Sequence, residues 1–92
     1  MSQHLHEYNA EAAAFVRWMR HFIAEGGVRP DNVDEFERRS QAWQLKLEEI
    51  LYHAFAGGEL TEKTYRENVE MLDVSAGHIR DTIGAVRGLV HQ

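Results

Sequence analysis

Hydrophobic residues recur along three stretches of the chain at alternating steps of three and four. This spacing keeps one face of an α-helix apolar, whereas a strand would show alternation with a period of two. We therefore predict an all-α chain with three amphipathic helices. Their apolar series are Leu5, Tyr8, Ala12, Phe15, Met19, Phe22; then Val33, Phe36, Ser40, Trp43, Leu47, Ile50, Ala54; and then Tyr65, Val69, Leu72, Ala76, Ile79, Ile83, Val86, Val90.

Two glycine pairs, at 26–27 and 57–58, separate the three series. Glycine commonly ends a helix because it adopts the left-handed conformation without steric cost. The pattern predicts helices over about 3–25, 31–56 and 61–90. Connections of about five residues make neighbouring helices antiparallel.

Polar residues stand where each predicted helix begins. Ser2, Asp31 and Thr61 have side chains that can accept hydrogen bonds from the first helical turn. Ser75 could begin a separate helix, but the apolar series keeps its phase there, so we expect one continuous helix. Ser40 occupies an apolar position, where a hydroxyl usually bonds to the carbonyl one turn earlier.

The chain is short for a domain that holds its core unaided. Its 92 residues make one domain, 1–92, which buries roughly 60–65 % of its unfolded surface. We predict an antiparallel three-helix bundle that associates with a second copy into a larger helical bundle.

The third helix carries a further stripe away from its apolar series. Glycines inside exposed helices cost roughly 1 kcal/mol each relative to alanine, yet small residues allow another backbone to approach closely. The stripe is therefore interpreted as a dimer interface; loosely selected, frayed terminal turns are the alternative. Its residues are Val74, Gly77, Asp81, Gly84 and Gly88.

The second helix also has more apolar residues than one core face requires. Leu45, Tyr52 and Phe55 lie on its far side, with Leu51 between the two faces. A helix that is apolar nearly all round is usually buried on several sides, which favours an interface here too. In the alternative, Tyr52 and Phe55 pack under the loop at 57–60.

Trp18 lies off the apolar series, beside Arg17. An exposed tryptophan near an arginine is typical of a binding anchor. We favour the alternative, in which its ring folds over the second or third helix at the edge of the bundle.

Away from the chain ends, each predicted helix carries one histidine with a carboxylate one turn away. Such pairs on facing helices build di-iron sites, which makes a metal-binding, ferritin-like bundle the second functional hypothesis. The Glu-x-x-His spacing of those sites is absent, so we expect solvated pairs and no cofactor. The pairs are His21 with Glu25, His53 with Glu49, and His78 with Asp81. The remaining His4, His6 and His91 are near the ends, where we expect solvent exposure.

The segment at 51–57, Leu-Tyr-His-Ala-Phe-Ala-Gly, resembles the histidine-phosphotransfer motif. The resemblance implies phosphotransfer at His53 within a four-helix bundle, and it covers only these residues. The position that is basic in the motif holds Ala56 here, so the charge that would stabilise a phosphoryl group is missing.

Composition and charge exclude some functional classes and cellular locations. The chain has no cysteine, and its 10 Lys and Arg residues against 15 Asp and Glu give a net charge of −5. Its basic residues are scattered, which argues against nucleic-acid binding. No run of 18 apolar residues and no secretory signal occur, so we expect a cytoplasmic protein without membrane segments.

Chemistry-bearing motifs are lacking. The glycine pairs lack the lysine and hydroxyl of a phosphate-binding loop. We therefore expect no catalytic residues. The sequence favours a non-enzymatic interaction module, an adaptor, chaperone or inhibitor, that binds itself and another protein.

Overall fold

The computed structural model describes residues 3–90 and consists of three helices: α1 (Gln3–Ala24), α2 (Val33–Ala56) and α3 (Glu62–Val90). Residues 3–90 contain no strand, so the all-α prediction is confirmed. The helix boundaries lie within two residues of those expected. Ser2, His91 and the side chain of Val90, which the sequence analysis considered, lie outside the described part.

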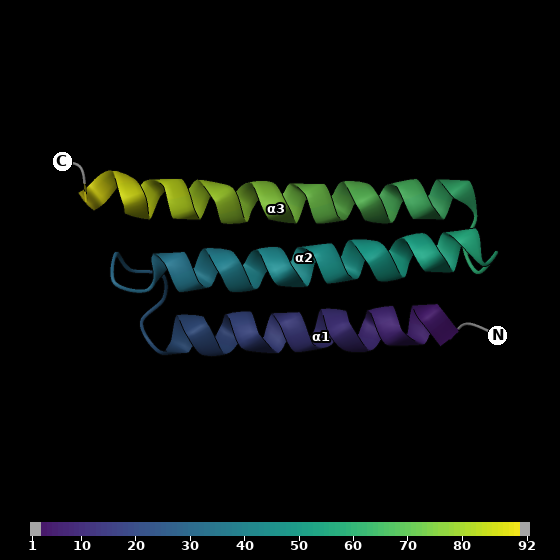
Figure 1. Ribbon diagram of the computed structural model, residues 1–92, viewed down its shortest axis with the longest axis horizontal. Coiled ribbons are helices and arrows are strands. Elements are labelled where there is room, and N and C mark those ends of the chain that lie inside the picture. The colour runs from purple at the N-terminus through teal and green to yellow at the C-terminus, as the bar shows by residue number, and fades with distance from the viewer. Residues whose placement is uncertain (1–2, 91–92) are drawn as a thin grey trace.

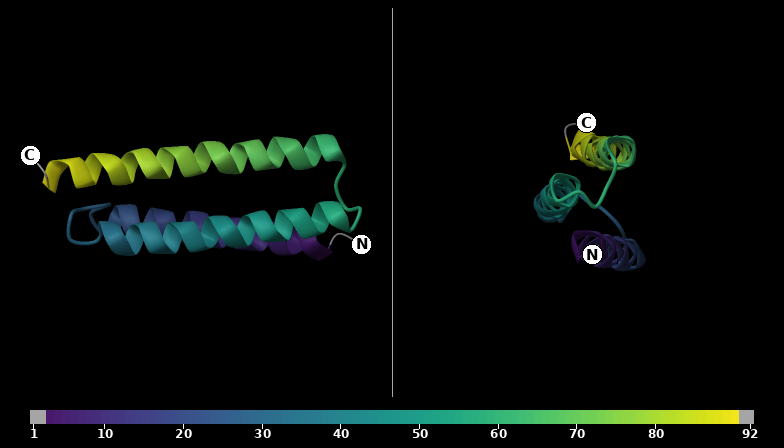
Figure 2. Two further views of the ribbon diagram at one scale, coloured as in Figure 1. Left: turned by 45° about the horizontal axis from the view of Figure 1, so that its top comes forward. Right: turned by 90° about the vertical axis from the view of Figure 1, so that its right-hand side faces the viewer.

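The middle helix of the sequence is also the middle helix in space. α2 lies between α1 and α3, and the chain reverses direction at each loop (Figure 1). Both outer helices pack along α2, but across residues 3–90 no Cα atom of α1 lies within 8 Å of a Cα atom of α3. The end-on view shows the three helices as a bent layer with α2 at the bend (Figure 2). The arrangement is therefore more open than a bundle in which every helix packs closely on both others.

Most of the buried residues belong to α2 because this helix has a neighbour on each side. One core cluster joins Phe15 of α1 and Leu72 of α3 to α2. The other joins the start of α2 to Ile83 and Val86 near the end of α3. The α2 members are Leu47 and Leu51 in the first cluster, and Val33 and Phe36 in the second.

The loop between α1 and α2 corrects one prediction. α2 begins at Val33 with Asn32 at the N-cap position, so Asp31 does not cap the helix. Asp31 instead pairs with Arg29 at 3.1 Å. The Asn32 side chain makes no cap hydrogen bond; it accepts from the Arg29 backbone N–H and donates to the carbonyl of Gly27. The Asn32 amide thus links two backbone groups of the loop. Aspartate could not do this because its carboxylate has no N–H donor.

Three other local predictions are confirmed. The Thr61 hydroxyl accepts a hydrogen bond from the Thr64 N–H at 3.2 Å and so caps α3. Buried Ser40 donates to the Glu37 carbonyl at 3.1 Å, about one turn earlier. α3 continues through Ser75 without interruption.

Candidate functional site

A groove runs between α1 and α3 on the side away from α2. We call it the α1–α3 groove; its volume is about 340 Å³. α1 contributes four lining residues and α3 contributes three. They are Phe15, Val16, Met19, Arg20, Ser75, His78 and Ile79.

The α1 wall of this groove is apolar because the hydrophobic arc of α1 is wider than the face that α2 covers. Phe15 is buried against α2, and Met19 is half-buried beside it. Val16 is 47 % exposed, and Ile23, seven residues later and therefore on the same face, is 64 % exposed. This surface was not predicted because neither residue falls on the three-and-four apolar series of α1.

Trp18 lies against α2, on the opposite side of α1 from the exposed aliphatic residues. Its ring stacks on Phe36 of α2 with 5.6 Å between centroids, and on Phe15 at 6.1 Å. The Arg39 guanidinium covers it at 5.1 Å. The tryptophan thus packs at the edge of the core. This is the position expected if its ring folds over the second helix.

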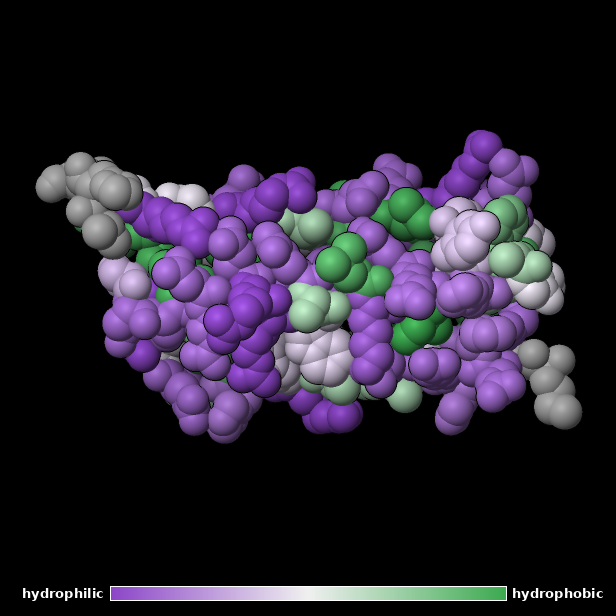
Figure 3. All heavy atoms as spheres, viewed as in Figure 1, coloured by the Kyte–Doolittle hydropathy of each residue, from purple (hydrophilic) through white to green (hydrophobic). Residues whose placement is uncertain are grey.

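The three apolar residues predicted as an α2 interface have different surroundings. Leu45 is 67 % exposed, and Tyr52 is also exposed. Phe55 is half-buried and stacks on Tyr65 of α3 with 4.5 Å between ring centroids, so it contributes to the packing of α2 against α3. On the face where α2 lies foremost, hydrophobic atoms form separate spots among hydrophilic ones (Figure 3).

The predicted α3 stripe lies on the side of the helix away from the core. Val74 and Asp81 are exposed, as are Gly84 and Gly88. A Cβ atom at either of these glycines would meet no atom within 4 Å. Gly77 is half-buried beside Arg80.

The histidine–carboxylate pairs lie apart from one another. His21 pairs with Glu25 at 3.0 Å and His53 with Glu49 at 3.8 Å, all four side chains being more than half exposed. His78 borders the α1–α3 groove, and Asp81 is on the outer side of α3. Within residues 3–90, no three His, Asp or Glu side chains gather in a way that could hold a metal ion.

A polar contact that the sequence did not reveal joins the start of α1 to the loop before α3. The Glu59 carboxylate accepts hydrogen bonds from the backbone N–H groups of His4 and Leu5, at 3.1 and 3.3 Å. It also contacts the His4 ring, which lies 6.1 Å from that of His53. Burial disfavours the charged form of Glu59, but the hydrogen bonds from His4 and Leu5 outweigh it and lower the pKa.

A second groove, of about 360 Å³, lies between α2 and α3. Gln44 lines it together with Ile79, Ile83 and Arg80. Gln44 is 8 % exposed, and neither polar atom of its side chain has a hydrogen-bond partner within the described structure. The amide sits in the α2–α3 contact as an unsatisfied polar group.

No family model, no curated protein and no solved structure matches the chain.

Proposed function

We propose that this protein is a non-enzymatic interaction module that self-associates, with its antiparallel three-helix unit forming part of a larger helical bundle. A cytoplasmic adaptor, chaperone or inhibitor would use such a module. The observation that carries the proposal is a pair of exposed aliphatic side chains on one face of α1: Val16, which lines the α1–α3 groove, and Ile23, seven residues further along the helix.

Exposed large hydrophobic residues occur on all three helices. Single exposed residues are ordinary on a protein surface, but apolar residues grouped along a groove are typical of a binding surface. Two helices place two of them on one face next to a hollow: Val16 and Ile23 on α1, where Val16 lines the α1–α3 groove, and Met71 and Val74 on α3, which line a hollow bordered by Glu67 and Glu70. The exposed set is Val16, Ile23, Leu45, Tyr52, Met71, Val74 and Leu89.

The small size of the chain supports the same proposal. The backbones of the outer helices α1 and α3 lie close to α2 but not to each other, so a large share of their surface contacts solvent. A domain of this length has a thin stability margin. Covering the apolar face of α1 would add burial that the isolated chain lacks.

Sedimentation equilibrium over a wide range of protein concentrations tests the proposal. We expect a mass that rises from one chain towards two, together with a melting temperature that rises with concentration, because association stabilises the folded state by mass action. A single-chain mass at every concentration would contradict self-association.

Within residues 3–90, no helix has the length and apolar character needed to cross a membrane.

A further inference from the structure

We infer that the α1–α3 groove is the self-association surface, and that each copy's α1 fills the groove of the other copy in a two-fold dimer. The inference rests on the proposed self-association and assigns it to a definite surface. That surface differs from the α2 and α3 faces that the sequence pattern favoured.

The helix arrangement gives the first argument. In a four-helix bundle each helix packs on two neighbours. Here α2 lies at the bend between α1 and α3, whose backbones approach α2 but not each other (Figure 2). Side chains of α1 and α3 line the groove between these two helices. The three helices thus occupy three corners of such a bundle, and one more helix placed against α1 and α3 would complete it.

The groove has the composition of an interface core. Phe15 and Met19 form its apolar floor on the α1 side, and Ile79 forms it on the α3 side. Arg20 and His78 are its ionisable residues, and no carboxylate lines it in the described part of the chain, although the sequence contains 15 Asp and Glu residues. Cores of protein interfaces are similarly depleted of acidic groups. The net charge of −5 therefore does not oppose contact between two copies at this surface.

Symmetry identifies the occupant. The groove requires a helix with an exposed aliphatic stripe. α1 has one in Val16 and Ile23 and α3 has one in Met71 and Val74, but of these four residues only Val16 lines the groove itself. A two-fold axis beside α1 would place each stripe in the other copy's groove, so one operation covers both. A helix from another protein would fill one groove without using this self-complementarity.

The available area is sufficient for a stable dimer. The molecule measures 50 by 21 by 15 Å, so the face that contains the groove spans about 50 by 21 Å. A stable interface buries about 800 Å² on each partner. A face of this length and width can supply that area.

Charge substitution on matched residues tests the inference. Val16→Glu and Ile23→Glu place a carboxylate in the proposed interface, while Leu45→Glu is the control, because Leu45 is 67 % exposed and Ile23 is 64 % exposed. We expect the two groove variants to raise the dimer dissociation constant by roughly tenfold or more, since burying an unpaired carboxylate is costly. Leu45→Glu should leave it unchanged.

The possible outcomes separate the inference from the proposed function. If the wild-type chain dimerises, and the dimer persists in Val16→Glu and Ile23→Glu but is lost in Leu45→Glu, the inference is overturned and self-association stands. A wild-type chain that stays monomeric would overturn both. Circular dichroism checks the fold of each variant; if a glutamate variant loses helicity, Val16→Ser and Ile23→Ser provide the same comparison with smaller polar groups.

Discussion

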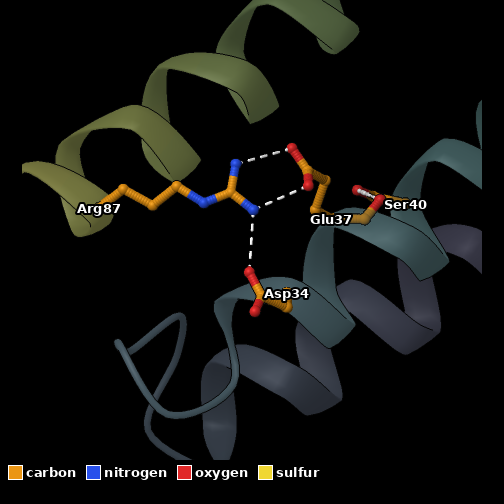
Figure 4. Close-up of polar contacts among 4 residues, drawn as sticks. All are labelled: Asp34, Glu37, Ser40 and Arg87. Atoms are coloured by element: carbon orange, nitrogen blue, oxygen red, sulfur yellow. Dashed lines mark hydrogen bonds and ion pairs between the residues drawn. The ribbon is translucent and has the colours of Figure 1, made fainter.

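Arg87 of α3 donates hydrogen bonds to both carboxylate oxygens of Glu37 on α2, at 2.9 and 2.8 Å (Figure 4). The same guanidinium donates to Asp34 at 2.9 Å. Paired donors that match the two carboxylate oxygens form one of the stronger polar contacts in proteins. The contact lowers the pKa of Glu37, chiefly through the hydrogen bond from Arg87, and raises that of Arg87. It joins the last turns of α3 to the first turns of α2.

Replacing the guanidinium should weaken this junction. Arg87→Met keeps an aliphatic stem but leaves Glu37 and Asp34 without their cation, so we expect a lower melting temperature at low salt. The difference from wild type should shrink at about 1 M salt, where the screening length falls to roughly 3 Å. Arg66→Met is the control, because Arg66 pairs with Glu62 within one exposed helix face. Equal effects of the two variants would contradict a special role for Arg87.

The contact between Glu59 and the start of α1 should make stability depend on pH. The folded state lowers the pKa of Glu59 below its usual value of 4.5. The charged carboxylate therefore stabilises the fold fully above the unfolded-state pKa, and this contribution disappears as the pH falls through the folded-state pKa. Glu59→Gln should be less stable than wild type at pH 7 and nearly equal to it in strong acid. Urea unfolding across this range measures the difference; a gap that stays constant would show that the charge does not matter.

The buried amide of Gln44 should reduce stability. Both of its polar atoms lack partners in the described structure, and an unsatisfied buried group costs about 1–3 kcal/mol. Gln44→Met has similar length without these atoms, so we expect its free energy of unfolding to rise by about that amount. Chemical denaturation measures it. A loss of stability would mean that the amide is satisfied in solution, by water or by another chain.

An added methyl group at Gly84 should stabilise α3. The position is exposed within the helix, and a Cβ atom there meets nothing within 4 Å. Alanine is favoured over glycine in helices by about 1 kcal/mol, so Gly84→Ala should raise the free energy of unfolding by about that amount. The bulkier Gly84→Leu should leave the dimer intact if copies meet at the α1–α3 groove. Loss of the dimer in Gly84→Leu would instead favour the stripe predicted from the sequence.

The helices were predictable because their signals are local. The three-and-four spacing determined their number and approximate bounds, and Thr61 and Ser40 behave as their sequence positions imply. Asn32, and not the predicted Asp31, occupies the N-cap position of α2. Which of the two residues stands there depends on the path of the loop, and residue preferences for the N-cap do not predict that path.

The candidate site was harder to predict because it depends on how the helices are placed. The spacing of α1 and α3 follows from packing on α2, and Val16 becomes a groove residue only through that spacing. The contact of Glu59 with His4 joins residues 55 positions apart, and nothing in either local sequence indicates it.

Amide hydrogen exchange should rank the helices by their neighbours. α2 packs on both sides and contains most of the buried residues, whereas the α1 backbone lies close to α2 alone and Phe15 is its buried residue. Opening of a segment with few buried contacts needs less free energy than global unfolding. In dilute protein we therefore expect the amides of α1 to exchange faster than those of α2. At high concentration, exchange in α1 should slow more than exchange in α2, because the second copy covers the groove face of α1. Slowing confined to α2 would place the contact between copies on that helix instead.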